Sequence, residues 1–524
     1  MSVEPDSVQP CERNSLSIVR KRVFWPPFTL LIIAVVYSFY NITDFLSTMT
    51  QINNWILIQF DWLFSYATLC LLLSLIAVYF SPLGKIRIGG SQAEPLLTKW
   101  RWFSITLCTT LATGILFWAV AEPMYHVYVP PVSLDLPANS DAVRGFTMAT
   151  MFMHWSFSPY AIYCVPSLVF ALCYHNMNKP FTIGTSLDPA IGEYLVQRGS
   201  NVIDSIALFA LVAGMSASLG TGILVLSGGI EAELNIENGK FLMAVVTIII
   251  VFTFVLSAVS GLQKGMARLS SLNAQIFVFF CLFVFIFGPT TFIVTNGLDG
   301  LIEYVQSFMA RSVNQLTAPE DDWSRSWTIF YFANWYAWAP IAALFLGRIA
   351  RGYTVKQFIQ VNLILPSCCA IIWMSTLSGA AIHLDGESDG MLRDSLLNTG
   401  PESVIYTLFD NLPMASFMTL ALIVITFISF VTAADSNTDA MSRLCTKSSH
   451  HSHEKTETSS IKMKLIWGTT IGTIAWVMVS FANVDGIKMM TSLGGLPALL
   501  IIMLTNLSLF VLWKRVVCGD PLEP

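Results

Sequence analysis

A short row of aromatic rings in "WTIFYFANWYAWAP" (327–340) is the part of this sequence best suited to binding chemistry. Tyr331 lies four residues before Trp335, and Trp338 lies three residues after it. Residues three or four apart are neighbours on one face of a helix, so these rings would form one row. The face of an aromatic ring attracts cations, and the row is therefore a candidate cation site.

A second row occurs in "MHWSFSPYAIYCVP" (153–166). Tyr160 and Tyr163 are three residues apart, and Trp155 lies five residues before Tyr160, across Pro159. If the two helices face each other, their rings form a cage that suits a quaternary ammonium group, which cannot donate a hydrogen bond. Helix packing or an interfacial aromatic belt is the alternative for either row alone. The prolines and polar residues beside both rows favour the binding site.

The composition places both rows in a membrane. Of the 524 residues, 54% are hydrophobic and 12% are charged, and the mean hydropathy is +0.64. Apolar runs of about twenty residues indicate transmembrane helices. We predict an all-α polytopic membrane protein with twelve such helices, at 24–43, 58–80, 103–123, 146–175, 204–229, 241–260, 275–296, 327–350, 357–382, 413–435, 462–483 and 491–513.

The basic residues predict the orientation of these helices, because loops rich in Lys and Arg stay in the cytoplasm. With the N-terminus inside, 22 of the 28 Lys and Arg residues fall in cytoplasmic segments. The chain then divides into a cytoplasmic tail (1–23), a transmembrane domain (24–513) and a second cytoplasmic tail (514–524). The first apolar run has no small-residue cleavage site, so we predict a retained helix rather than a signal peptide.

Several function classes lack their motifs in this sequence. It contains no P-loop, no GxGxxG after a strand, and no HExxH or GxSxG, and its ten cysteines form no CxxC pair. We therefore expect no enzyme, no metal, no organic cofactor and no nucleic-acid partner. A channel would need a repeated filter or a charged ring. Helices interrupted by Gly and Pro, as in "TGILFWAVAEPMYH" and "GMSASLGTGILVLSGG", are typical of secondary transporters instead.

The motifs around both rows resemble those of the betaine/choline/carnitine transporter (BCCT) family. The first row resembles the family's W-T-x-F-Y-W-A-W-W-x-x-W-[AS]-P, and the second resembles HWGxHPWAIY. "LFWAVAEPMYH" is similar to FWGVAEPxxHY, "SGLQKGMARLSSLN" to SGLxKGIxxLSxxN, and "VTAADS" to VTSADS. These motifs cover most of the chain in the family's order.

The resemblance implies a 5+5 inverted-repeat core in helices three to twelve, preceded by two extra helices and assembled as a homotrimer. It implies an aromatic box that binds trimethylammonium-like compounds, with Trp338 on the path toward the cytoplasm. The residues carried over to the box are Trp155, Tyr160, Tyr163 and Trp335.

Departures from the family pattern bear on the substrate. Phe332 and Asn334 stand where the family has tryptophans, and Tyr160 stands where it has the last tryptophan of HPW. The Asn334 amide could bind a substrate or cap a neighbouring helix. Gly114 stands where choline-selective relatives carry an aspartate, so the resemblance favours a zwitterion whose carboxylate meets the backbone near Gly114.

The coupling ion is left open between Na⁺ and H⁺. Sodium-dependent relatives use paired hydroxyls where this chain has Thr432 and Ala433, and sodium-independent exchangers use an arginine in the region of Arg268. Ser218 and Thr221 are the further candidate ion ligands. The sequence favours ion-coupled import of glycine betaine, carnitine or a related betaine across the cytoplasmic (inner) membrane. Sodium-independent substrate:product exchange and choline uptake are the alternatives.

Overall fold

The computed structural model describes residues 19–111, 114–260, 263–446, 461–520 and 522. The side chains of some further residues inside helices, Thr432 and Arg268 among them, lie outside this described part. Within it, helices form the whole architecture and β-pairing is limited to two isolated bridges.

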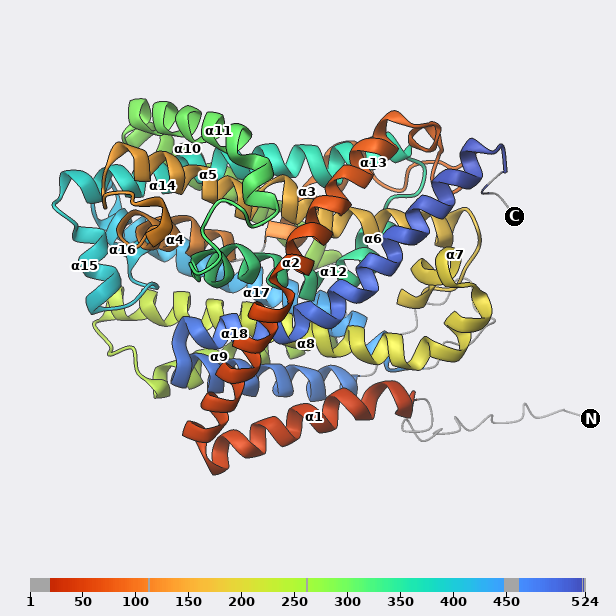
Figure 1. The fold of residues 1–524 in the computed structure, drawn as a ribbon. Helices are drawn as coiled ribbons and strands as arrows, with labels where there is room; N and C mark the ends of the chain where they lie inside the picture. Colours follow the sequence, from red (N-terminus) through yellow and green to blue (C-terminus); the bar gives the residue numbers. More distant parts are fainter. Residues whose placement is uncertain (1–18, 112–113, 261–262, 447–460, 521, 523–524) are drawn as a thin grey trace, which may run out of the picture.

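The helices form one bundle (Figure 1), in which α2 crosses the other helices diagonally. The short α7, α15 and α16 lie at its two ends. In chain order the α-helices are α1 (Lys21–Tyr40), α2 (Ile42–Phe80), α3 (Lys99–Leu111), α4 (Gly114–Tyr128), α5 (Asp141–Trp155), α6 (Phe157–His175), α7 (Asp188–Ile191), α8 (Glu193–Leu234), α9 (Lys240–Ser260), α10 (Gln263–Phe287), α11 (Thr290–Ser312), α12 (Phe330–Arg348), α13 (Val355–Ile359), α14 (Leu365–Glu387), α15 (Met391–Asn398), α16 (Val404–Asp410), α17 (Ala415–Leu444) and α18 (Ile461–Val517).

Membrane-length helices confirm the predicted class, an all-α polytopic membrane protein. Among the described residues, seven helices are long and apolar enough to cross a membrane. The number is up to eight if α10 and α11, which meet at a bend of 110°, count as one broken span. The count of twelve therefore stays a prediction, as does the inverted repeat. The last two predicted spans lie within α18, which kinks at Asn483, where φ is 52°.

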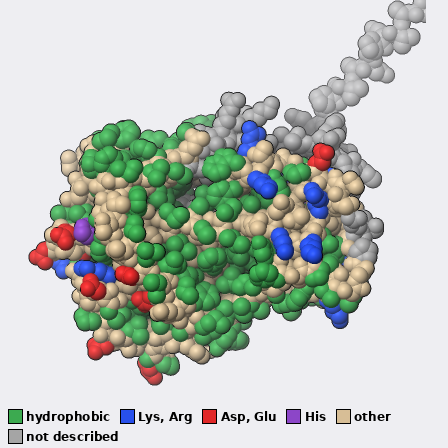
Figure 2. Space-filling model, turned by 90° about the horizontal axis from the view of Figure 1, so that it is seen from above, with side chains coloured by type: hydrophobic (Ala, Val, Ile, Leu, Met, Phe, Trp, Pro, Cys, Tyr) green, Lys and Arg blue, Asp and Glu red, His purple; other side chains and the backbone are tan. Residues whose placement is uncertain are grey.

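The surface agrees with a bilayer environment. On the face in Figure 2, one end carries mainly Lys and Arg side chains, and the opposite end carries most of the Asp and Glu side chains together with a few Lys and Arg. The wide area between them is mainly hydrophobic. Many large apolar side chains point outward from the bundle, such as Val36 of α1 (62% exposed) and Ile286 of α10 (64% exposed). In a soluble protein so much exposed apolar surface would cause aggregation.

Glycines let the central helices approach closely, as is common in membrane bundles. A Cβ atom on Gly222 of α8 would lie 2.0 Å from the Phe430 ring of α17. A Cβ atom on Gly495 of α18 would lie 2.4 Å from the carbonyl oxygen of Ala333 in α12. Because these glycines lack a side chain, α8, α12, α17 and α18 form one tightly packed centre.

At one end of the bundle the start of the described chain is fixed to two central helices. The Arg20 guanidinium pairs with Asp204 of α8 at 2.7 Å. Its backbone N–H donates to the carbonyl of Cys445, just beyond α17, at 2.7 Å. Figure 1 shows α1 beginning and α18 ending at this same end.

Candidate functional site: an aromatic cage between helices

A break in the chain brings the second aromatic row into one place. Helix α5 ends at Trp155, and Ser156 has φ −116° and ψ −121°, which belongs to neither a helix nor a strand. Helix α6 begins directly afterwards, so Tyr160 and Tyr163 lie in its first two turns. The sequence predicted one continuous helix over 146–175, with Pro159 inside it. That residue is instead inside the first turn of α6, where proline is tolerated because the first N–H groups have no helical partner.

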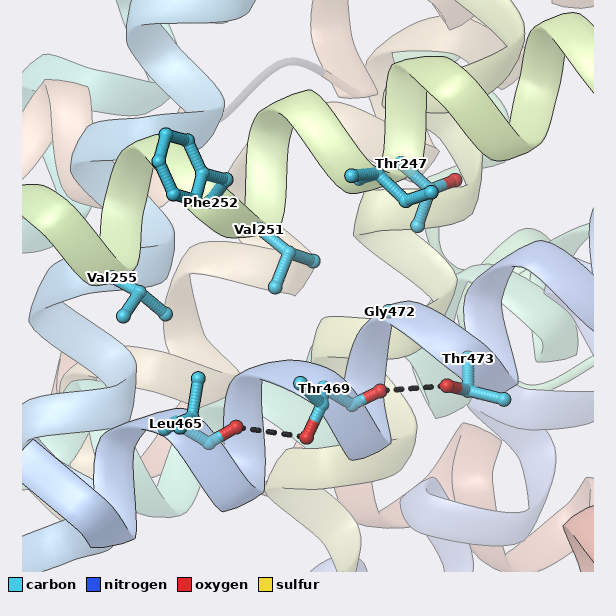
Figure 3. A pocket seen from close by; sticks show the side chains of 9 residues that line it. Thr247, Val251, Phe252, Val255, Leu465, Thr469, Gly472 and Thr473 are labelled. Atoms are coloured by element: carbon cyan, nitrogen blue, oxygen red, sulfur yellow. Dashed lines mark hydrogen bonds between the residues drawn. The ribbon is translucent and has the colours of Figure 1, made fainter.

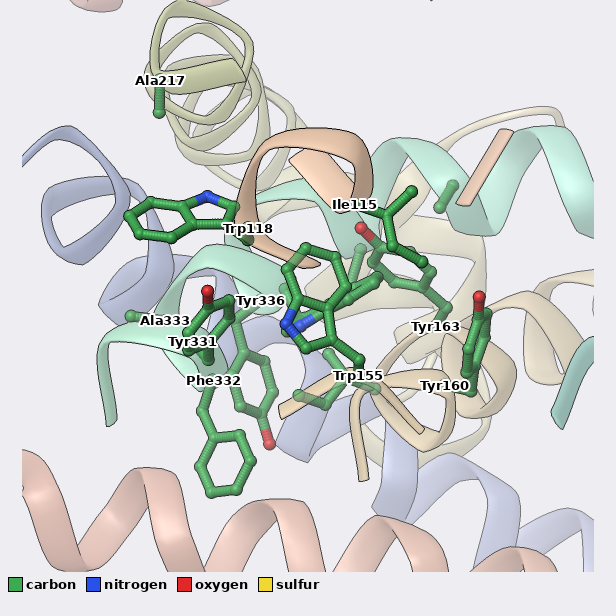
Figure 4. Packing of buried hydrophobic residues seen from close by; sticks show 14 of the residues in the cluster. Ile115, Trp118, Trp155, Tyr160, Tyr163, Ala217, Tyr331, Phe332, Ala333 and Tyr336 are labelled. Carbon is green, nitrogen blue, oxygen red and sulfur yellow. The ribbon is translucent and has the colours of Figure 1, made fainter. Parts of the chain in front are cut away.

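Trp335 of α12 is the point at which the two rows meet. Its ring centroid lies 5.8 Å from that of Trp155, 5.9 Å from that of Tyr160 and 5.1 Å from that of Tyr163. The ring planes are inclined at 82°, 47° and 66°. Figure 4 shows Trp155 between Tyr331 on one side and Tyr163 and Tyr160 on the other. The structure thus brings together the four predicted box residues.

These rings are enclosed in this structure. Exposed fractions are 4% for Trp155, 0% for Tyr160, 5% for Tyr163 and 3% for Trp335. Burial excludes water, and a cation–π contact is stronger where water is excluded. A ligand could reach this centre only after the helices move.

Of the three other predicted substrate residues, Gly114 contacts the cage, whereas Trp338 and Asn334 lie on another face of α12. A Cβ atom on Gly114 would lie 3.6 Å from the Trp155 ring, so this glycine faces the cage directly. Trp338 lies one turn after Trp335, and its indole packs against Gly214 of α8. Asn334 is half-buried on a face of α12 near that of Trp338.

A buried carboxylate supports the cage from behind. Glu122 of α4 accepts hydrogen bonds from the Trp155 indole (2.9 Å) and from the Tyr331 hydroxyl, both at Oε2. Its Oε1 is bonded to His154 Nδ1 at 2.6 Å and to His126 Nε2 at 3.2 Å. All five side chains are buried. We call Glu122, His126 and His154 the acid–histidine cluster.

The acid–histidine cluster fixes the orientation of two cage rings. Trp155 donates to Glu122, and the Trp335 indole donates to the backbone carbonyl of His154 at 3.1 Å. Glu122 and His154 lie within the motifs "LFWAVAEPMYH" and "MHWSFSPYAIYCVP", but the sequence assigned neither of them a role. Their position in apolar helices could have identified them, because burying a polar group at membrane depth costs free energy and such groups usually have a function.

The residue types of the cluster are ones that bind metal ions, and one ligand atom from each member lies within 4.8 Å of the others. Its distances, however, are those of hydrogen bonds. Two ligands on one zinc-like ion would stand about 3.4 Å apart, given metal–ligand distances of about 2.0–2.2 Å. The 2.6 Å between Glu122 Oε1 and His154 Nδ1 is too short for that. We interpret the group as a hydrogen-bonded cluster.

The predicted ion ligands lie on helices that are in contact. Thr221 of α8 is buried and donates to the carbonyl of Ala217, whereas Ser218 is half-buried. Helix α17 packs on this part of α8 through Phe430 and Gly222. The predictions for Thr432 and Arg268 fall on side chains outside the described part and remain predictions.

An open groove of about 300 Å³ lies elsewhere, between α9 and α18 (Figure 3). Its lining is mainly apolar, and the hydroxyls of Thr469 and Thr473 donate to carbonyls of their own helix, at 2.8 and 2.9 Å. It therefore offers a polar ligand little, and the aromatic cage is the better candidate site.

Comparison with known proteins shows the family of this chain. A family model described as "BCCT, betaine/carnitine/choline family transporter" matches residues 22–516. The chain belongs to this family. It is therefore a multi-pass membrane transporter and not an enzyme, as the motifs predicted.

Several relatives of this chain are named for the compound that they transport. The chain is 28% identical over 495 residues, 93% of each chain, to the "Glycine betaine transporter OpuD" of Bacillus subtilis (strain 168). It is 31% identical over 390 residues, 72% of each chain, to "Glycine betaine transporter 1" of Vibrio parahaemolyticus. It is 27% identical over 447 residues, 85% of this chain and 87% of the relative, to an "Ectoine/hydroxyectoine transporter" of Virgibacillus pantothenticus.

Proposed function

We propose that this protein imports a quaternary-ammonium zwitterion, such as glycine betaine or carnitine, across the cytoplasmic membrane by alternating access. The observation that carries the proposal is the buried cage in which Trp155, Tyr160 and Tyr163 surround Trp335. Each ring contact with a cation contributes about 0.5–2 kcal/mol, which offsets the cost of removing the ammonium group from water.

The carboxylate of the zwitterion has a place beside the cage. Gly114 faces Trp155 and has no side chain, so we place the substrate carboxylate against the backbone at this position. No acid stands at position 114, which favours a zwitterion over a bare cation such as choline. The substrates named for the relatives support this class.

The transport cycle begins with the outward-open carrier. A substrate enters from outside, its ammonium group settles among the rings, and rocking of one helix bundle against the rest opens the cytoplasmic side. We propose ion-coupled import, with Na⁺ or H⁺ as the driving ion, in a homotrimer with both termini inside. Sodium-independent substrate:product exchange is the alternative, because Ala433 lacks the hydroxyl of a complete sodium site.

Uptake of radiolabelled glycine betaine and carnitine into proteoliposomes tests the proposal. We expect saturable uptake into empty vesicles when a sodium or proton gradient is imposed. Uptake only into vesicles preloaded with substrate would establish the exchanger instead. Uptake of neither compound by folded protein would contradict the proposed substrate class.

A further inference from the structure

The proposed function does not explain why, in the acid–histidine cluster, every acceptor position of the Glu122 carboxylate has a hydrogen-bond donor. Glu122 Oε1 faces the two imidazole rings, and Oε2 accepts from Trp155 and Tyr331. A carboxylate has about four acceptor positions, and here each has a donor. Four donors stabilise the ionised form of Glu122. The cluster therefore carries one negative charge when both histidines are neutral.

His154 can take up one proton without any heavy atom moving. Its Nδ1 must donate to Glu122, because an ionised carboxylate only accepts. In the neutral ring Nε2 then carries the lone pair, which accepts from the Thr328 hydroxyl at 3.0 Å. A proton added at Nε2 can donate to the same Thr328 oxygen, because a hydroxyl both donates and accepts.

His126 is less suited to hold that proton. Its Nε2 faces Glu122, and its Nδ1 is buried with no hydrogen-bond partner among the described residues. A proton added to Nδ1 would be a buried donor without an acceptor, which is costly. His154 is therefore the position at which the cluster gains a proton most readily.

We infer that His154, held against Glu122, is a proton-binding site, and that its proton competes with the cationic substrate in the aromatic cage. The inference rests on the proposed function, since it requires a cation among the rings. It favours Na⁺ over H⁺ as the driving ion, because a proton that competes with the substrate at this site does not drive its import. Trp155 is both a wall of the cage and a donor to Glu122, so the charge of the cluster acts directly behind the bound ammonium. Adding a proton removes this negative charge, and a neutral cluster attracts the cation less.

Other charged groups near the cluster keep their roles in both states. The Lys488 ammonium of α18 lies 4.1 Å from the centroid of the Trp327 ring, which in turn contacts His126 at 4.6 Å. It offsets part of the charge of Glu122, but protonation still changes the charge behind Trp155 by one unit. The further titratable groups on elements packed around α4, α5 and α12 are Tyr125, Glu303, Arg311, Tyr331, Asp385, Arg393, Glu402 and Asp485.

Substrate affinity measured at two pH values tests the inference. Purified protein is titrated with radiolabelled glycine betaine, a compound that does not itself titrate between pH 5 and 8, the range in which histidine ordinarily does. We expect affinity to fall about fivefold or more from pH 8 to pH 5.5, a coupling of the usual size. We also expect binding near neutral pH to release protons into a weakly buffered solution.

Two histidine variants locate the effect. His154→Gln keeps a polar side chain and is expected to bind with the same affinity at both pH values. His175→Gln, which alters a ring bonded to the Gly347 carbonyl at the far end of α6, should keep the pH dependence. Any one of three results would overturn the inference but not the proposed function. These are a wild-type affinity that does not change with pH, binding without proton release, and full pH dependence in His154→Gln. Absence of binding at every pH would overturn the proposed function as well.

Discussion

At the scale of single residues, Trp335 connects the recognition surface to its support. Its ring contacts three other rings, and its indole N–H is anchored on the carbonyl of His154. The smaller Tyr160 ring stands where the family has a tryptophan, and it is fully buried. The cage therefore keeps its cation-binding faces although its walls differ from the family pattern.

Gly114 is the residue whose substitution should change substrate choice. A Cβ atom there meets Trp155 at 3.6 Å and Trp118 at 3.8 Å, which are ordinary contacts, so a Cβ atom fits without overlap. We predict that Gly114→Asp weakens uptake of glycine betaine about tenfold, because the new acid repels its carboxylate, and that it improves uptake of choline. Competition assays in proteoliposomes measure both effects. Gly239→Asp, which adds an acid where nothing lies within 4 Å, should change neither.

Glu402, in the turn between α15 and α16, should make stability depend on pH. Burial, with a smaller contribution from the charge of Glu231, raises the pKa of Glu402 from 4.5 to about 7. In the folded protein the Glu402 carboxyl then keeps its proton up to about pH 7, whereas in the unfolded chain it loses that proton near pH 4.5. Stability is thus lost as pH rises between these values, and the loss is complete above them.

The variant Glu402→Gln removes this titration. We expect it to raise the melting temperature at pH 8 relative to the wild type and to leave it nearly unchanged at pH 5. Thermal unfolding of purified protein at both pH values measures the difference. The control Glu320→Gln alters an exposed acid and should change neither value. Equal effects of Glu402→Gln at the two pH values would disprove the assignment.

At the scale of helices, the sequence predicts much of the site. The spacing of three and four residues predicts that the rings of one row lie on the same face of a helix. The apolar runs predict where the helices are. The facing of the two rows could not be derived from spacing alone, because it depends on the break at Ser156 and on packing between distant helices. The partners of Glu122 come from α4, α5 and α12, and the bonds that cross between helices are visible only in the structure.

Helix packing at Gly222 should be sensitive to one added methyl group. A Cβ atom there would overlap the Phe430 ring at 2.0 Å, so Gly222→Ala must displace that ring or push α8 and α17 apart. Overpacking of this kind costs about 1–3 kcal/mol. We expect a lower melting temperature and slower uptake. Gly199→Ala, also in α8, meets its neighbour at 3.7 Å and should behave like the wild type. An unchanged Gly222→Ala variant would show that this contact opens easily.

At the scale of the whole molecule, the charge distribution predicts which end faces the cytoplasm. The end of α18 lies at the basic end of the surface in Figure 2, because Figures 1 and 2 share their horizontal direction. Basic residues favour the cytoplasmic side. The same end carries the Arg20–Asp204 pair, which lies at the start of α1.

Cysteine labelling in intact cells tests this orientation. Cys518 is exposed, and with the other cysteines replaced it should react with a membrane-permeant maleimide but not with an impermeant one. A cysteine introduced at Val132, which is 88% exposed beyond α4 in a segment predicted to lie outside, should react with both. The opposite pattern would invert the predicted topology.

The central claim is that the cage recognises a positive charge through its rings. The most direct measurement compares how well glycine betaine and 3,3-dimethylbutanoate displace radiolabelled glycine betaine from the purified protein. The second compound has the same shape, but a carbon replaces the charged nitrogen. We predict that it binds at least about 30-fold more weakly, because it forms no cation–π contact, and that this difference narrows in Trp335→Ala. Equal displacement by the two compounds would contradict the account.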